Sequence, residues 1–218
     1  MQSVTDAGRR APRRDATENR AALLAAAAAA LSEAPDASLE TIAAAAGLTR
    51  RAVYGHFASR EALVLALIDS GAERLNAIAA TTDHAHTPTA IALLGARLWT
   101  AVEHVRLLAG MALREPYAPH VADALEPVRA RIRELVERGV ADGTVRRDIR
   151  PSMLARLVEE SAIAVLLEAA ATQLGDAEGR RLVLLAVLST VGLSWLDAGA
   201  LIDSTPELAG PLPSEASR

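Results

Sequence analysis

Cysteine is absent from this chain of 218 residues. Its absence excludes disulfide bonds, zinc sites built from thiolates and a redox sensor based on a thiol. Lysine is absent too, so all 23 basic residues are arginines, which we interpret as a bias of genomic base composition. A chain without cysteine is compatible with a reducing compartment, and we expect a soluble, cytoplasmic protein.

Aromatic residues are scarce: the chain has 2 Trp, 2 Tyr and 1 Phe. Hydrophobic residues nevertheless make up 51% of it, and many of them are alanines, which favour helices. Val and Ile are scattered, without the alternating runs that would indicate a strand. The composition therefore predicts an all-α fold.

Long hydrophobic runs are also missing. "LVLLAVLSTVGLSWL" at 182–196 is shorter than the roughly 18–20 residues that a membrane-spanning helix needs. "AALLAAAAAAL" at 21–31 resembles the apolar part of a signal peptide, but Glu18 lies just upstream and alanine is only weakly apolar. We predict buried helices for both stretches and no membrane partner.

The charge is unevenly distributed around a formal net charge of −4. Residues 1–60 carry 8 Arg against 6 acidic residues, giving +2, and residues 61–218 carry 15 Arg against 21 acidic residues, giving −6. A weakly positive N-terminal part on an acidic body is typical of a protein that contacts DNA with one end.

Caps and breaks predict a series of helices with short connections. Ser38, Thr49 and Ser59 are good N-caps, because their hydroxyl oxygens can accept hydrogen bonds from free backbone N–H groups. Gly47 ends the second helix, where a left-handed residue costs least. The predicted helices span about residues 17–32, 39–46, 49–56, 59–80, 89–113 (with a break near 102–104), 121–142, 151–174 and 177–198.

The stretch "GLTRRAVYGHF" at 47–57 places two of the five aromatic residues in a helix of barely two turns. Val53 and Phe57 are four residues apart, so both can face a core and stabilise a helix that is too short to be stable alone. Arginine can donate two hydrogen bonds to guanine, and Tyr and His can donate to phosphates. With the preceding helix, the stretch predicts a DNA-binding helix-turn-helix. Its predicted exposed face consists of Arg50, Arg51, Tyr54, Gly55 and His56.

The stretch "SLETIAAAAGLTRRAVYGHFASREALVLAL" at 38–67 resembles the DNA-binding domain of the TetR family of transcriptional regulators. The resemblance lies in the order of "IAAAAGLT", a short helix ending in Tyr-x-His-Phe, and "SREAL" at the start of the fourth helix. It implies a homodimer on a palindromic DNA operator, with half-sites roughly 34–36 Å apart. The residues that match the family's DNA-facing positions are Thr49, Arg50, Arg51, Tyr54, Gly55 and His56, and those that match phosphate-contacting positions are Thr41 and Arg60. Gly55 stands where a bulkier residue is frequent, which leaves the operator sequence open.

Residues 1–14 lack hydrophobic periodicity, and the last twenty residues contain Pro206, Pro211 and Pro213 with several serines. We therefore expect a flexible basic arm at 1–14 and a disordered tail at 199–218. The resemblance implies the helix-turn-helix domain at 15–77, a helical ligand-binding and dimerisation domain at 78–198, and a mode of regulation. Whether the arm contacts DNA is left open. In the family, a ligand shifts the fourth helix and changes the spacing of the two reading helices, and repression is the commoner outcome.

The sequence of the second domain supports the family resemblance only in outline. Helices 151–174 and 177–198 are apolar around much of their circumference, as in a four-helix bundle between two subunits, although burial within one subunit also explains them. An unknown small-molecule effector would bind among residues 89–142, closed by part of 151–174. Its candidate lining residues are Trp99, His104, Leu108, Met111, Tyr117 and Met153, each of which also fits a plain core or surface position. Scarce aromatics favour an aliphatic or acyl ligand, while Glu159, Glu160 and Glu168 would suit a cation or a solvated face.

Two other functional classes remain as alternatives. An all-helical enzyme needs convergent acid, base or metal groups, and the sequence offers only His84 and His86 beside Asp83 in a polar linker. We therefore expect no enzyme, no cofactor and no metal site. A helical adaptor would bind a protein partner through the helix-turn-helix, but Arg50 and Arg51 suit an anion better than an apolar partner. Salt dependence separates DNA binding from the adaptor, because phosphate binding weakens steeply with salt and an apolar protein interface does not.

Overall fold

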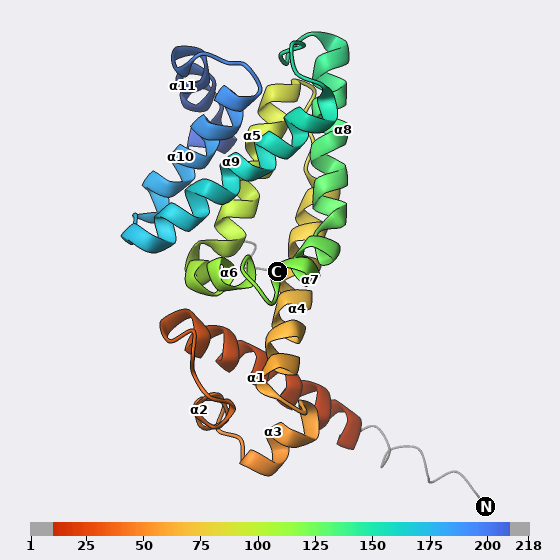
Figure 1. The fold of residues 1–218 in the computed structure, drawn as a ribbon, viewed down its shortest axis with the longest axis vertical. Coiled ribbons are helices and arrows are strands. Elements are labelled where there is room, and N and C mark those ends of the chain that lie inside the picture. Colours follow the sequence, from red (N-terminus) through yellow and green to blue (C-terminus); the bar gives the residue numbers. More distant parts are fainter. Residues whose placement is uncertain (1–10, 210–218) are drawn as a thin grey trace, which may run out of the picture. The chain divides into compact units, whose positions relative to one another are not determined.

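The computed structural model describes residues 11–209 and the side chains of residues 20–208 (Figure 1). Within these residues the regular structure is helical and no strand occurs, which confirms the predicted all-α fold. The helices are α1 (Ala11–Glu33), α2 (Leu39–Ala45), α3 (Arg50–His56), α4 (Arg60–Thr81), α5 (Thr87–Val102), the 3₁₀ helix η1 (Glu103–Val105), α6 (Arg106–Ala112), α7 (Ala118–Ala124), α8 (Glu126–Asp142), α9 (Pro151–Thr172), α10 (Asp176–Thr190), α11 (Trp195–Ser204) and α12 (Pro206–Ala209).

The chain divides into two compact units, Met1–Ser70 and Gly71–Arg218, and the division falls inside α4. Unit 1 contains the predicted helix-turn-helix, and unit 2 contains the helices from α5 onward. In the part of the chain that the structure describes, no helix is long and apolar enough to span a membrane.

The starts of α2, α3 and α4 are fixed by the predicted side-chain caps. The Ser38 hydroxyl accepts the backbone N–H of Thr41 at 3.1 Å, and the Thr49 hydroxyl accepts that of Ala52 at 3.3 Å. The Ser59 hydroxyl accepts the N–H three residues further on, at 3.1 Å. Each cap satisfies a donor that has no partner within its own helix, so α2, α3 and α4 begin where the sequence predicts.

Gly47 ends α2 and turns the chain into α3. Its φ is +67°, a left-handed value that glycine adopts without steric cost. Its N–H donates to the carbonyl of Ala44 at 3.1 Å, and the N–H of Leu48 donates to that of Ala43 at 3.0 Å. These two bonds form a Schellman motif, which explains the tight turn between the two short helices.

The core of unit 1 consists of side chains repeated at helical spacing on each helix. The exposed fraction of these side chains is 5% or less. They are Leu23, Ala27 and Leu31 on α1, Leu39, Ile42 and Ala43 on α2, Val53 on α3 with Phe57 after it, and Leu63 and Val64 on α4. Short helices such as α2 and α3 are unstable alone, so this shared core holds them in place.

The core of unit 2 is formed by α5, α8, α9 and α10. Helix α9 packs against α8 and α10, and α5 packs against the same two helices (Figure 1). The side chains of Leu135, Leu154, Leu184 and Leu188 are fully buried there. The break predicted near 102–104 is confirmed, because η1 separates α5 from α6.

Three boundaries differ from the sequence predictions. Helix α1 starts at Ala11, so residues 11–14 are helical and do not belong to a flexible arm; residues 1–10 lie outside the described residues. The predicted helix 121–142 is divided into α7 and α8, and Pro127 lies in the first turn of α8, where its missing N–H costs nothing. The predicted helix 177–198 ends at Thr190, because Gly192 has a φ of +110°.

The predicted disordered tail at 199–218 is wrong for its first eleven residues. Helix α11 continues to Ser204 and α12 follows from Pro206, and both pack on unit 2. The exposed fractions of Ile202 and Leu208 are only 2% and 1%. Pro206 occupies the first position of α12, which tolerates proline, so it begins a helix instead of marking disorder. Residues 210–218 lie outside the described residues.

Candidate nucleic-acid interface

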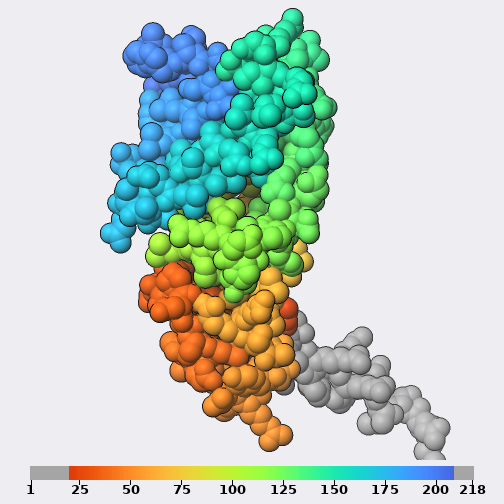
Figure 2. Space-filling view, viewed as in Figure 1, coloured from red at the N-terminus to blue at the C-terminus, as the bar shows by residue number. Residues whose placement is uncertain are grey.

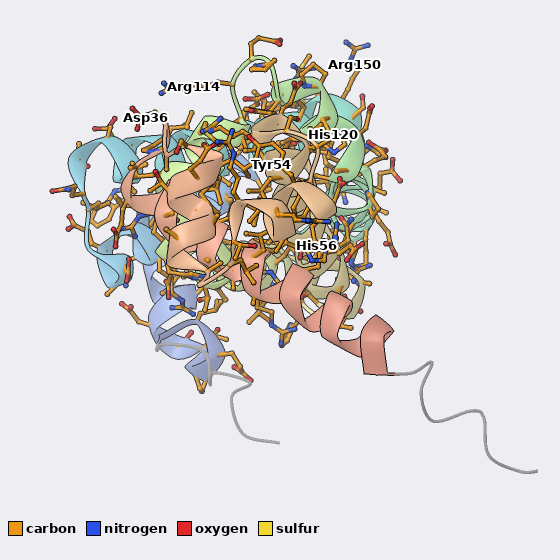
Figure 3. The ribbon with its side chains drawn as sticks, turned by 90° about the horizontal axis from the view of Figure 1, so that it is seen from below. Asp36, Tyr54, His56, Arg114, His120 and Arg150 are labelled. Carbon is orange, nitrogen blue, oxygen red and sulfur yellow. The ribbon has the colours of Figure 1, made fainter. Side chains whose placement is uncertain are left out.

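Helix α3 has one buried face and one exposed face. Val53 is fully buried and Phe57 is 5% exposed, as predicted. The side chain of Arg50 is 72% exposed and Tyr54 is 44% exposed. Figure 3 shows Tyr54 and His56 on this short helix. The polar side chains of α3 are therefore available to a partner, while its apolar side chains anchor it.

Arg50 and Tyr54 are joined by a residue that the sequence reading missed, Glu40 in the first turn of α2. Nη2 of Arg50 lies 3.4 Å from Oε1 of Glu40, and the Tyr54 hydroxyl donates to the same oxygen at 3.3 Å. The Arg50 guanidinium also lies 5.4 Å from the centroid of the Tyr54 ring. One signal was present in the sequence: Glu40 is the only acidic residue between positions 37 and 60.

The Glu40 carboxylate is charged at neutral pH. Its pKa lies below the ordinary value, chiefly because its own backbone N–H donates to it, and the charge of Arg50 and the Tyr54 hydroxyl act in the same direction. The candidate interface therefore contains one fixed negative charge beside its arginines.

Arg51 and Gly55 present a different environment on the same helix. Among the described residues, the exposed side chain of Arg51 has no hydrogen bond or ion pair. Gly55 is exposed, and a Cβ atom added there would meet nothing within 4 Å. His56 is half-buried at the end of the helix. This side of α3 thus offers one unpaired guanidinium next to open space.

The two threonines predicted to contact DNA lie at helix starts. Thr41 and Thr49 are both exposed, and Thr49 caps α3. The Thr41 hydroxyl lies 2.9 Å from that of Ser38. Their hydroxyls retain hydrogen-bonding capacity for an external oxygen, because a hydroxyl can donate one bond and accept two.

Arg60 has a structural role that competes with its predicted phosphate contact. Its Nε donates to the carbonyl of Ala37 at 2.9 Å, and its Nη2 donates to the carbonyl of Pro35. These bonds tie the start of α4 to the turn between α1 and α2. The remaining N–H groups of the guanidinium are free to bind, so the phosphate contact stays a prediction.

Trp99, the first predicted ligand-lining residue, is packed inside unit 2. It is 2% exposed and packs with Ala169 and Val183. Its ring lies directly over Gly179, where an added Cβ would approach the ring to 2.2 Å, and its Nε1 donates to the carbonyl of Asp176 at 3.1 Å. Glycine at 179 thus makes room for the indole between α5 and α10.

The other predicted ligand-lining residues do not share one environment. Leu108 and Tyr117 are buried and Met111 is half-buried, whereas His104 and Met153 are exposed. Figure 2 shows a hollow on the surface of unit 2 between α6, α8 and α9. Leu108 and Met111 belong to α6, one of the three helices around that hollow.

Some of the polar alternatives from the sequence form contacts within unit 2. Glu159 pairs with Arg129 at 2.7 Å, which uses one of the three glutamates predicted to suit a cation. Nδ1 of His84 accepts the backbone N–H of His86 at 3.0 Å. Across residues 11–209, no group of three or more His, Cys, Asp or Glu side chains is arranged to hold a metal ion.

Comparison with known proteins identifies the N-terminal part of the chain. The model of the family "Bacterial regulatory proteins, tetR family" matches residues 23–67, which include α2, α3 and the first turns of α4. No curated protein matches the chain.

Solved structures share the fold over most of the chain. SmeT, the repressor of the multidrug efflux pump SmeDEF of Stenotrophomonas maltophilia, is 23% identical, with a TM-score of 0.66 over 89% of this chain and 97% of SmeT. FadR from Bacillus subtilis is 16% identical, with a TM-score of 0.64 over 78% of this chain and 97% of FadR. PfmR from Thermus thermophilus, described as a TetR-family transcriptional regulator, is 18% identical, with a TM-score of 0.61 over 79% of this chain and 95% of PfmR. At these identities the likeness concerns the fold alone.

Proposed function

We propose that this chain is a DNA-binding transcriptional regulator of the TetR family, and that it acts as a homodimeric repressor which a small effector releases from a palindromic operator. One observation carries the proposal: Arg50, Arg51 and Tyr54 form an exposed polar face on a helix whose opposite face is buried. Such a helix fits the major groove, where arginine can bind guanine O6 and N7 with two hydrogen bonds.

The homodimer is supported by apolar side chains that unit 2 leaves exposed. Met153 and Leu157, which are four residues apart on α9, are 45% and 41% exposed, and Leu182 on α10 is 41% exposed. The inner faces of both helices are buried within the subunit, and these outer apolar side chains remain exposed among the described residues. A second copy that covers these faces would give a four-helix interface with two-fold symmetry.

The effector is proposed to bind unit 2 and to act through α4. Figure 2 shows the hollow between α6, α8 and α9, and Leu108 and Met111 of α6 are apolar residues suited to an aliphatic or acyl group. FadR from Bacillus subtilis is described in complex with stearoyl-CoA, and SmeT in complex with triclosan. Because α4 runs through the division between the two units, a ligand that favours one position of α4 would change the spacing of the two reading helices.

The adaptor and the enzyme remain the rival functions. An adaptor that bound an apolar partner through α3 would place the free guanidinium of Arg51 in an interface where it has no counter-charge. An enzyme would need catalytic groups that converge on one site. The exposed polar side chains of α3 are arginines and a tyrosine, which do not form a pair of a catalytic acid and a catalytic base. Duplex DNA supplies phosphate and base acceptors, to which the side chains of this surface can donate hydrogen bonds.

The test is selection of duplexes from a random pool with the purified full-length protein, without ligand and at low salt. We expect enrichment of one palindrome whose half-sites lie about one helical turn apart, with two chains bound per duplex and an affinity that falls steeply with salt. A folded dimer that enriches no sequence would contradict operator binding by the ligand-free form. Enrichment of a non-palindromic site by a single chain would contradict the homodimer.

A further inference from the structure

Glu40 gives the candidate interface a property that its arginines alone would not have. Its Oε1 contacts both Arg50 and Tyr54, at 3.4 and 3.3 Å, although α2 and α3 are separate helices. Arg50 also lies over the Tyr54 ring, so the three side chains restrain one another on the exposed surface. The neighbouring Arg51 has no such restraint within the described residues.

We propose that Glu40 is a specificity-determining residue, which weakens binding to duplexes that offer Arg50 no base acceptor. The proposal rests on the proposed function, because it assumes that α3 enters a DNA groove. Every duplex presents phosphates, which repel the Glu40 carboxylate and compete with it for Arg50. Only a duplex with a guanine opposite Arg50 accepts two hydrogen bonds from it, and these bonds compensate for the repulsion.

A role in folding stability does not explain the arrangement. The side chains of Glu40 and Arg50 are 49% and 72% exposed, and exposed ion pairs contribute little to folding. The effect of Glu40 is therefore expected on the ratio of two affinities. The parent protein binds its operator with Glu40 present, whereas non-specific binding carries the full repulsion without the compensating base contact.

The experiment compares the affinity of full-length parent protein and Glu40→Gln for two duplexes. One is the duplex recovered by selection and the other is a scrambled duplex of the same length and composition. We expect Glu40→Gln to bind the scrambled duplex about three- to tenfold more tightly, as for removal of one repulsive charge near phosphates, and to gain less on the selected duplex. The specificity ratio falls, while the thermal unfolding of the two proteins stays the same.

Two variants separate this role from a general change in charge. Glu61→Gln removes one negative charge from an exposed side chain in the first turn of α4, and it is expected to change both affinities by the same factor. Glu40→Asp keeps the charge beside Arg50, so it is expected to retain most of the parent specificity ratio. Comparing the two variants shows whether the specificity ratio depends on a negative charge at position 40 or only on the net charge of the protein.

Three results would overturn the inference. Equal gains on both duplexes would make Glu40 an ordinary surface charge, and so would the absence of any change. A loss of affinity for the selected duplex would make Glu40 a direct base contact. A parent protein that binds neither duplex would overturn the proposed function, and the inference with it. The other three results leave the proposed function intact, so the two kinds of failure are distinguishable.

Discussion

Arg51 on α3 and Arg131 on α8 are the same residue type in opposite surroundings. The Arg131 side chain is 16% exposed, and its guanidinium pairs with Asp83 at 3.0 Å and with Glu134 at 2.7 Å. It also donates to the carbonyl of Thr82 at 2.9 Å. Arg51 is exposed and has no partner of this kind among the described residues.

The difference shows which arginines are available to an external anion. A guanidinium that is saturated within the protein must break those bonds before it binds a phosphate, whereas an unpaired one loses only water. Arg131 and Arg138 share Asp83 and thereby hold the connection between α4 and α5 against α8. The arginines of unit 2 that form such pairs stabilise the fold, whereas Arg51 of α3 is free to bind. Arg50 must first give up its contact with Glu40.

The largest expected effect concerns a side chain that is fully committed to the fold. Trp99→Ala should lower the free energy of unfolding by about 3–5 kcal/mol, because it empties the space over Gly179. Trp195→Ala is the matched control, since Trp195 is 75% exposed, and it should change the free energy of unfolding little. Urea unfolding measures both. Similar losses for the two variants would contradict the burial that the structure assigns to Trp99.

The next effect concerns the unpaired guanidinium. Arg51→Ala should weaken binding to the selected duplex by about 1–3 kcal/mol if Arg51 contacts a guanine, and should leave thermal unfolding unchanged. Arg156→Ala removes a charge from α9, where the side chain of Arg156 is 74% exposed, and serves as the control for net charge. Fluorescence anisotropy with a labelled duplex measures the affinities. An unchanged affinity for Arg51→Ala would remove this residue from the reading surface.

A smaller effect is expected for the shared carboxylate of unit 2. The pKa of Asp83 lies below its ordinary value of 3.8, chiefly because Arg138 donates a hydrogen bond to it. A lowered pKa means that Asp83 stabilises the fold at pH values above 3.8 and that this contribution fades as the pH falls through its folded-state pKa.

Asp83→Asn should therefore lower the free energy of unfolding by about 1 kcal/mol at neutral pH, as for exposed ion pairs. The difference between parent and variant should shrink as the pH falls below 3.8. Urea unfolding at several pH values measures this difference. A difference that stayed constant with pH would mean that the charge of Asp83 does not stabilise the connection.

The smallest effect is a gain in stability. Gly55→Ala should raise the free energy of unfolding of unit 1 by about 0.5–1 kcal/mol, because alanine favours the helix and the added Cβ meets nothing. Gly179→Ala provides the contrast, since its Cβ would collide with Trp99 and destabilise unit 2. Thermal unfolding detects both the gain in stability and the loss. A loss of stability for Gly55→Ala would show that the open space beside α3 is not open.

The two units also differ in how far the sequence predicts them. In unit 1 the signals are local: Ser38, Thr49 and Ser59 cap helices, and Gly47 ends one, so α3 has the predicted bounds. In unit 2 the break at Gly192 was missed. A glycine in a helical pattern does not reveal its φ, and the turn depends on the N–H of Arg146, which donates to the carbonyl of Val191 from a distant loop.

Similar long-range partners explain the other errors. The carbonyl of Leu208 accepts from Arg180, so α12 is held by a residue 28 positions earlier. The pairing of Glu40 with Arg50 depends on the angle between two helices, which no local pattern records. For the predicted DNA contacts, the structure describes the exposure and the partners of each side chain, and the contacts themselves stay predictions.

The most direct test of the account repeats the duplex selection with Arg51→Ala and compares the enriched sequences with those of the parent. The account predicts that the same palindrome is recovered with the same spacing, but that the preference for guanine is lost at one symmetric position in each half-site. An enriched sequence identical to that of the parent at every position would contradict the claim that the exposed face of α3 reads the operator through this residue.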